Sequence, residues 1–322
     1  MTRGKRAIIS GIAGQDGSYL AELLLAKGYR VLGFLKKGGD ASGLPNSGSD
    51  LVLEQTELVR KDDIARWTRL YKPDEIYNFA ASSFIPDSWE DPHRTFQVNT
   101  LLVAAFLEVL KDRCPGTRFY QASSSEIFGD PSDSPQEEST PHNPVTPYGV
   151  SKLAAHQLVG LYRRRHGIFA VSGILYNHES PRRPERFVTQ KIARAAAEIS
   201  RGRKEKLRLG NIDARRDWGF AGDFVRGIWM MLQAGEPDDY ILATGTPHTI
   251  RDFLAVAFGH VGHRWEEWVE IDPALLRPVD VGLLVGNPAR AKSRLGWEPT
   301  VSFEELVKMM VDAQLARATG GR

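Results

Sequence analysis

Apolar positions in the first half of the chain alternate between short runs and helical spacing. Short apolar runs at residues 7–9, 29–35, 75–80, 118–123 and 169–175 predict strands. Between them, apolar residues recur at helical spacing over residues 17–27, 101–110 and 150–164. Because strands that alternate with helices form a parallel sheet covered on both faces, the sequence predicts an α/β fold of the Rossmann type, a doubly wound parallel sheet.

The pattern changes after Tyr176. Proline, arginine and asparagine cluster in the run NHESPRRPERF, and isolated apolar strands such as residues 207–209 follow. We therefore expect a first domain over residues 1–176, joined by later segments of the chain. Residues 177–322 are expected to form mainly a smaller C-terminal α/β region that completes a cleft.

Composition and charge narrow the class of protein. The 322 residues include 42 basic and 40 acidic side chains, a formal net charge of +2. Nucleic-acid and membrane-surface proteins carry a clustered basic excess, so neither partner is expected. Cys114 is the single cysteine, which excludes an intramolecular disulfide, and no metal-binding cluster is expected. With neither a signal peptide nor an apolar run of about 18 residues, a cytoplasmic enzyme is expected.

A glycine-rich segment directly follows the first predicted strand and opens a helix. Gly11, Gly14 and Gly17 leave room for a pyrophosphate to approach the backbone at the helix N-terminus. The alternative is a tight glycine turn that binds no ligand. The second strand ends at Lys36 and Lys37, where an NAD enzyme usually carries an acid. Two ammonium groups favour the 2′-phosphate of NADP, although a solvated lysine pair is the simpler alternative.

Two groups of residues suggest chemistry. Tyr148 and Lys152 are four apart on a predicted helix and share one face, so the ammonium favours the phenolate. Ser124 and Glu126 follow a predicted strand, and if that segment is extended both point to one site. The serine suits a hydrogen bond to the reacting oxygen, and the glutamate an acid or base beyond simple redox chemistry. A chance helical pair and a solvent-facing glutamate are the alternatives.

The chain resembles the extended short-chain dehydrogenase/reductases, and within them the GDP-mannose 4,6-dehydratases. The resemblance covers nearly the whole length and rests on the runs GIAGQDGSYLAELLLAKGY, PDEIYNFAASS, FYQASSSEIFG, TPYGVSKL, ILYNHESPRR, FVTQKIARA, LRLGNIDARRDWGFAGDFV and RPVDVGLLVGNPARAK. NHESPRR and RRDWG are the most specific of these, because they belong to the sugar-nucleotide side.

The resemblance implies a lyase that dehydrates GDP-mannose to GDP-4-keto-6-deoxymannose with NADP. Tyr148, assisted by Lys152, would take the proton of the sugar 4-hydroxyl while hydride leaves C4. Glu126 would remove the C5 proton as water leaves C6, and the hydride would return to C6 with a proton delivered at C5. The alternatives are a GDP-manno-heptose 4,6-dehydratase, an epimerase or reductase of the same fold, and a cofactor-binding sensor without turnover.

Binding residues carry over by motif. Beside Tyr148 and Lys152, the resemblance implies an NADP-binding set in residues 1–176: Gly11, Gly14, Gln15, Asp16, Gly17, Lys36, Lys37, Glu57, Leu58 and Ala80. It implies a set of GDP-sugar contacts, mainly in residues 177–322: Ser83, Asn177, Val188, Lys191, Leu207, Gly210, Arg216, Arg277 and Asp280. It also implies a homodimer, with a tetramer as the alternative.

Several positions depart from the family pattern. Ser124 replaces a threonine and keeps its hydroxyl, while Glu57, Ser82 and Asp280 replace an aspartate, a glutamine and a glutamate. The arginine- and serine-rich stretch after the second strand, which reaches a neighbouring subunit's cofactor in relatives, is absent. These departures concern affinity, sugar preference and assembly more than reaction type.

Overall fold

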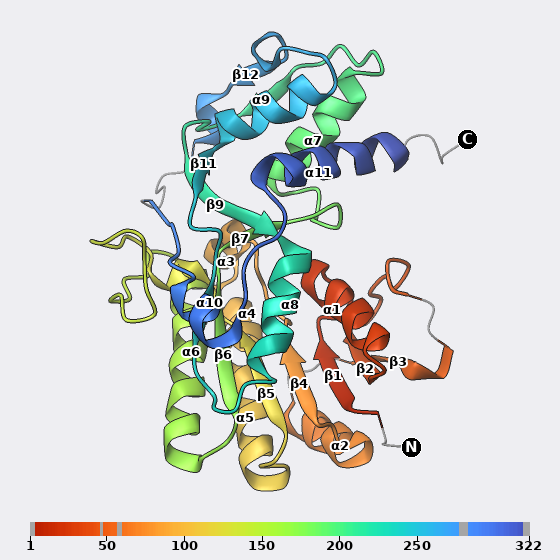
Figure 1. The fold of residues 1–322 in the computed structure, drawn as a ribbon, viewed down its shortest axis with the longest axis vertical. Coiled ribbons are helices and arrows are strands. Elements are labelled where there is room, and N and C mark those ends of the chain that lie inside the picture. Colours follow the sequence, from red (N-terminus) through yellow and green to blue (C-terminus); the bar gives the residue numbers. More distant parts are fainter. Residues whose placement is uncertain (1–3, 46–47, 57–59, 277–282, 318–322) are drawn as a thin grey trace.

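The computed structural model describes residues 4–45, 48–56, 60–276 and 283–317. Within these residues, seven parallel strands form the main sheet in the order β10-β6-β5-β4-β1-β2-β3 (Figure 1). Their bounds are β1 Arg6–Ser10, β2 Arg30–Leu35, β3 Leu51–Gln55, β4 Glu75–Asn78, β5 Arg118–Ala122, β6 Ala170–Leu175 and β10 Tyr240–Leu242. The predicted Rossmann-type parallel sheet is confirmed.

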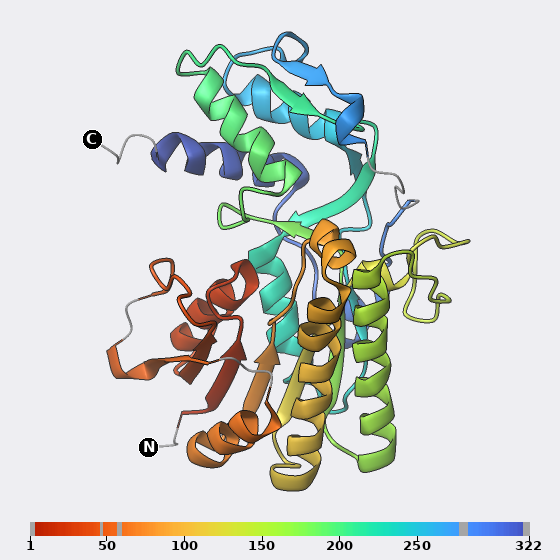
Figure 2. The same cartoon turned by 180° about the vertical axis from the view of Figure 1, so that it is seen from behind.

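Helices cover both faces of this sheet, because successive strand residues point to opposite faces and both sets are apolar. One face packs against α1 (Gln15–Ala26), α8 (Ala221–Met231) and α10 (Ala289–Leu295). The other face packs against α2 (Lys61–Tyr71), α5 (Leu102–Arg113) and α6 (Pro147–His166), which lie in front of the sheet in Figure 2.

A smaller region lies beyond the carboxyl ends of the strands, at the top of Figure 1. Its own apolar core joins α7 (Val188–Ile199), α9 (Ile250–His260) and α11 (Phe303–Arg317). Its short strands are β7 (Asn177–Glu179), β8 (Leu207–Leu209), β9 (Arg215–Phe220), β11 (Pro247–Thr249) and β12 (Val269–Ile271). Strands β11, β9 and β7 form one small sheet, and β12 and β8 form another.

The short elements between β4 and α5 form the rim of the main sheet facing this region. They are α3 (Ile85–Glu90), α4 (Pro92–Phe96) and a π-helical turn, η2 (Gln97–Leu101). Single 3₁₀ turns occur at η1 (Gly48–Asp50), η3 (Ser125–Ile127), η4 (Trp265–Glu267) and η5 (Pro273–Leu275).

Segments from after residue 176 return to the first half of the molecule. Strand β10 pairs with β6 along residues 173–175, and α8 packs against α1. These contacts show where the later segments lie, and the division at residue 176 stays a prediction. In the described part of the chain, no helix has the length and apolar character needed to cross a bilayer.

Candidate active site

A cleft of about 1540 Å³ separates the main sheet from the smaller region. The carboxyl ends of the parallel strands form its floor, which is where open α/β sheets place ligands. Most of the predicted site residues line it: Gly11, Gly14, Gln15, Asp16, Gly17, Lys36, Lys37, Ala80, Ser83, Ser124, Glu126, Tyr148, Lys152, Asn177, Val188, Lys191, Gly210 and Arg216.

The glycine-rich loop forms a backbone cradle at one end of the cleft. Gly11 has a φ of +72°, and a Cβ there would lie 3.0 Å from the backbone nitrogen of Ala80. A Cβ on Gly17 would lie 2.4 Å from the carbonyl oxygen of Gly11, so side chains are excluded. Gly14 is the N-cap of α1, and no side chain caps the helix. The N–H groups of its first turn are therefore available to an anion, as a pyrophosphate requires.

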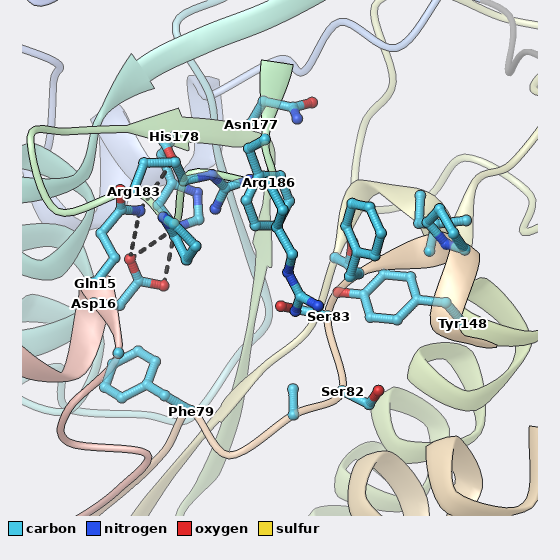
Figure 3. A pocket seen from close by; sticks show the side chains of 18 of the residues that line it. Gln15, Asp16, Phe79, Ser82, Ser83, Tyr148, Asn177, His178, Arg183 and Arg186 are labelled. Atoms are coloured by element: carbon cyan, nitrogen blue, oxygen red, sulfur yellow. Dashed lines mark hydrogen bonds and ion pairs between the residues drawn. The ribbon is translucent and has the colours of Figure 1, made fainter. Parts of the chain in front are cut away.

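The side chains of Gln15 and Asp16 turn toward β7 (Figure 3). The Asp16 carboxylate lies 2.9 Å from Nε2 of His178, and Gln15 donates to the carbonyl oxygen of His178 at 3.0 Å. Ser180 donates to the side-chain oxygen of Gln15 at 2.8 Å. The cleft-facing loop is thus tied to the NHES segment, so any contact that Gln15 and Asp16 make with a phosphate comes from their backbone.

This ion pair perturbs both of its members. Burial alone would lower the pKa of His178, but the charge and hydrogen bond of Asp16 outweigh it and the pKa is raised. Burial alone would raise the pKa of Asp16, but His178 outweighs it and the pKa is lowered. Each member of the pair therefore favours the charged form of the other.

Lys36 and Lys37 follow β2 and line the same end of the cleft as the cradle. Both side chains are exposed. Their position beyond the second strand is where the ribose of a bound dinucleotide lies in this fold.

Tyr148, Ser124 and Glu126 meet near the middle of the cleft. Tyr148 lies in the first turn of α6, whose N-cap Thr146 accepts from the backbone of Gly149 at 3.0 Å. Burial raises the pKa of Tyr148 to about 12, a hydrogen bond with Ser124 opposes this rise, and the negative charge of Glu126 adds to it. Tyr148 is therefore protonated near neutral pH and needs a nearby positive charge to act as a base.

The premise that Ser124 and Glu126 share a face of an extended segment is wrong. Only Ser124 is extended, and Glu126 lies in the 3₁₀ turn η3 that Ser124 caps, its backbone N–H donating to Oγ of Ser124 at 3.2 Å. The turn arises because a serine side chain can bond the backbone two residues on. Both residues line the cleft despite this different geometry.

Lys152 lies one helical turn below Tyr148 and is buried. Its Nζ lies 5.8 Å from the centre of the Tyr148 ring and donates to the carbonyl oxygen of Ala122 at 2.9 Å. Burial lowers the pKa of Lys152 to about 8, although the charge of Asp16 works in the other direction. The ammonium is thus held at a fixed point beside the phenol.

The smaller region forms the opposite wall. Helix α7 begins there with no side-chain cap, and its first residues Val188, Thr189 and Lys191 line the cleft with Arg216 of β9. A helix N-terminus with cations beside it suits a second diphosphate. Leu207 is not among the lining residues and packs in the core of the smaller region, so its substrate contact stays a prediction. Glu57, Leu58, Arg277 and Asp280 lie outside the described residues.

The cleft is also lined by residues that the sequence patterns did not single out. Among them are Phe79, Phe84, His178, Arg183, Arg186 and Phe187. Arg186 reaches down from the NHESPRRPERF segment toward the loop that carries Ser83 (Figure 3). It lies 2.9 Å from Asp87 of α3 and 4.5 Å from the Phe84 ring, across the cleft from its own segment. The arginine cluster in that run was the only available signal.

No group of three or more histidine, cysteine, aspartate or glutamate side chains gathers as a metal site in the residues that are described.

Comparisons with known proteins agree with this arrangement. The sequence model of the family described as GDP-mannose 4,6 dehydratase matches residues 8–310. GDP-mannose 4,6 dehydratase 1 of Arabidopsis thaliana is 45% identical over 98% of this chain and 91% of its own length. The human GDP-mannose 4,6 dehydratase is 39% identical over 96% of this chain and 91% of its own length.

Solved structures share the fold. UDP-glucose 4-epimerase of Thermus thermophilus in complex with NAD superposes with a TM-score of 0.84 at 28% identity, covering 96% of this chain and 98% of that one. A dTDP-glucose 4,6-dehydratase of Bacillus anthracis superposes with a TM-score of 0.86 at 20% identity, covering 98% of each chain.

Proposed function

This chain belongs to the GDP-mannose 4,6-dehydratase family, and from this membership we propose how its cleft removes water from GDP-mannose to give GDP-4-keto-6-deoxymannose. The reaction class is that of a hydro-lyase, as in the curated relatives that match nearly the full chain. The observation that carries the residue assignment is the convergence of Ser124, Glu126, Tyr148 and Lys152 on one cleft.

The dinucleotide is proposed to be NADP. The glycine cradle and the uncapped start of α1 fit a pyrophosphate. A Cβ on Gly11 or Gly17 would collide with the backbone that shapes the loop, and the first-turn N–H groups of α1 have no side-chain cap. Lys36 and Lys37 add positive charge where a 2′-phosphate would lie. A dinucleotide held there would supply the hydride acceptor for C4 of the sugar and the hydride donor for C6.

Tyr148 is proposed to hold the 4-hydroxyl and take its proton, with Ser124 as a second hydrogen-bond partner for that oxygen. Since burial keeps the phenol protonated in the free protein, the positive charges of Lys152 and of the oxidised nicotinamide would favour the phenolate. Lys152 already uses one N–H on Ala122, which leaves two for the ribose hydroxyls.

Glu126 is proposed to serve the elimination. Once C4 is a ketone, the C5 proton is acidic and a carboxylate can remove it. The same carboxyl group can then give that proton to the hydroxyl leaving C6, so that one water molecule departs. When hydride adds to C6, C5 takes up one proton, which balances the proton that Tyr148 removed from the 4-hydroxyl. A reductase or epimerase needs no such group.

The GDP moiety is proposed to lie along the start of α7. Lys191 and Arg216 supply cations, Asn177 supplies an amide, and the free N–H groups of the first helical turn face the same space. Arg277 and Asp280 remain proposed contacts beyond the described residues.

A homodimer is proposed through the pair formed by α5 and α6, with a tetramer as the alternative. Val150 and Leu161 of α6 are exposed at 42% and 52%, and Leu101, the last residue of η2 directly before α5, is exposed at 60%. Exposed apolar side chains on packed neighbouring helices are typical of a subunit contact. The cytoplasmic location stays a prediction.

The test is to incubate the purified protein with GDP-mannose, and separately with GDP-manno-heptose, and to measure product mass and nicotinamide absorbance. Loss of the mass of one water molecule without net NADPH supports the proposal. Accumulated NADPH would indicate a simple dehydrogenase, and an isomer of unchanged mass an epimerase. Preference for the heptose would change the sugar but not the reaction.

Glu126→Gln tests the residue assignment. This variant should form NADPH up to one equivalent per site and then stop, because the C4 ketone forms but the C5 proton stays in place. Glu137→Gln, an exposed glutamate in the loop after η3, is the matched control and should turn over normally. Full turnover by Glu126→Gln removes Glu126 from the mechanism.

A further inference from the structure

A row of polar side chains crosses four adjacent strands beneath the cleft. Ser10 of β1 is in register with Asn78 of β4, Asn78 with Gln121 of β5, and Gln121 with Ser172 of β6. All four side chains are at most 1% exposed. An apolar row lies two residues earlier on the same strands and therefore on the same face of the sheet: Ile8, Ile76, Phe119 and Ala170. The polar row therefore faces α5 and α6.

Three of these residues form a directed hydrogen-bond chain. Ser10 donates to the side-chain oxygen of Asn78, and Asn78 donates to that of Gln121 at 2.7 Å. Gln121 then donates to the carbonyl oxygen of Ala122 at 2.9 Å. This is the oxygen that accepts from Nζ of Lys152, also at 2.9 Å.

We propose that Gln121 is a positioning residue, which fixes the carbonyl oxygen of Ala122 and through it the ammonium of Lys152. The other end of the chain is Ser10, directly before Gly11 of the dinucleotide cradle. The row thus fixes the position of Lys152 relative to the cradle, through hydrogen bonds that cross the sheet. The inference deepens the proposed function, since it assumes that Lys152 holds the nicotinamide ribose.

Stability alone does not account for the row. Apolar side chains of the same shape would fill this face of the sheet at similar stability, because each buried hydrogen bond contributes little net free energy while an unmade one is costly. A charged lysine held by one neutral carbonyl oxygen needs that oxygen at a fixed point. Gln121 provides this, because it occupies a second lone pair of the carbonyl group.

The consequence can be measured through cofactor binding. Two effects set the pKa of Lys152: burial by the surrounding core lowers it, and the negative charge of Asp16 raises it. Neither changes when Gln121 is replaced by methionine. Without the Gln121 N–H, the Ala122 carbonyl would bind the ammonium alone and favour its charged form.

The experiment compares NADPH dissociation constants from pH 6 to 10 (a range of about two units on either side of the expected titration) for the wild type, Gln121→Met and Ser172→Ala. In Gln121→Met the midpoint assigned to Lys152 should move upward by about 0.5 pH unit, and kcat should fall about tenfold. Ser172→Ala removes a hydroxyl from the same row at equal burial, and should match the wild type in both measurements.

A midpoint and kcat equal to those of the wild type in Gln121→Met, with loss only in the free energy of unfolding, would overturn the inference. Should Gln121→Met fail to fold, Gln121→Glu takes its place. Its protonated carboxyl group can accept from Asn78 and donate to the carbonyl oxygen of Ala122, as Gln121 does. NADPH affinity and kcat that equal those of the wild type at low pH, and are lost when the carboxyl group deprotonates, support the inference. Loss at every pH, or at none, overturns it. Because binding is measured without turnover, a wild type that leaves GDP-mannose intact refutes the proposed reaction and not this inference.

Discussion

The carboxylate of Asp16 and the imidazole of His178 meet at 2.9 Å inside the protein, although 162 residues separate them in the sequence. Nδ1 of His178 lies 2.7 Å from the carbonyl oxygen of Tyr176, and its ring stacks on Phe224 at 4.7 Å. The pair connects the first turn of α1 to β7, and so joins the two walls of the cleft.

Removing His178 should therefore destabilise the protein strongly. His178→Gln leaves the Asp16 carboxylate buried without its cation, and we expect a loss of about 3 kcal/mol in the free energy of unfolding, measured by urea titration. His260→Gln is the control, because His260 pairs with Asp312 at the surface, and its loss should be below about 1 kcal/mol. Equal losses in the two variants would contradict the assignment.

The same pair predicts a window of pH. The pKa of His178 is raised, so its contribution is complete below its ordinary pKa of about 6.5 and disappears as the pH rises through the higher folded value. The pKa of Asp16 is lowered, so its contribution is complete above about 3.9 and disappears as the pH falls through the lower folded value. The free energy of unfolding should show the pair's full contribution between about pH 3.9 and pH 6.5. The wild type should lose stability as the pH rises above this window, and His178→Gln should not show that loss.

Tyr148→Phe should abolish most activity and leave the fold intact. Only a hydroxyl and its bond with Ser124 are removed, and loss of the proton acceptor should lower kcat by about 10²–10⁴-fold. Tyr162→Phe, on the same helix but outside the cleft lining, should retain activity. Product formation and NADPH binding are the measurements, and a Tyr148→Phe variant with near-normal kcat would assign the proton to another group.

Lys36→Ala combined with Lys37→Ala should weaken NADP binding and spare NAD. We expect the dissociation constant for NADP to rise about tenfold or more, since a phosphate loses its charged hydrogen-bond partners. NAD lacks that phosphate and serves as the control ligand in calorimetric titrations. If both cofactors weaken equally, the lysines do not read the 2′-phosphate.

Arg186 and Asp87 should act together on the nucleotide-sugar. Their ion pair joins the NHESPRRPERF segment to α3 beside the cleft, and both side chains are 46% exposed, so it is a weak and reversible contact. Arg186→Gln and Asp87→Asn should each speed the release of GDP-mannose a few-fold, measured by stopped flow.

The double variant should release it no faster than either single one, because both changes break one contact. Arg194→Gln, which breaks a pair with Glu185 outside the cleft lining, is the matched control. Additive effects of Arg186→Gln and Asp87→Asn would show that the two residues act separately.

The sequence predicted the parts of this structure that depend on local spacing. The apolar runs located five strands, and the glycines on either side of Gln15 placed the cradle, because both patterns are set by neighbours along the chain. Tyr148 and Lys152 were found through their separation of four on a helix. Strand β3 was missed because its side chains are largely exposed, and β10 because it has only three residues.

Contacts between distant segments could not be predicted in this way. The pairing of Asp16 with His178 depends on how β7 returns over the cradle, and the pairing of Arg186 with Asp87 on how α3 faces the smaller region. The turn at Glu126 was also missed, because a serine cap competes with the extended conformation that the preceding strand suggests.

The position of β10 at the outer edge of the main sheet has a consequence for how the polypeptide is made. Residues 240–242 cover an edge of β6 that would otherwise offer unpaired N–H and C=O groups to other molecules. A nascent chain must therefore be synthesised well past residue 176 before that edge is covered. Until then this edge of β6 stays open to pairing with other chains, and the arrival of β10 closes it.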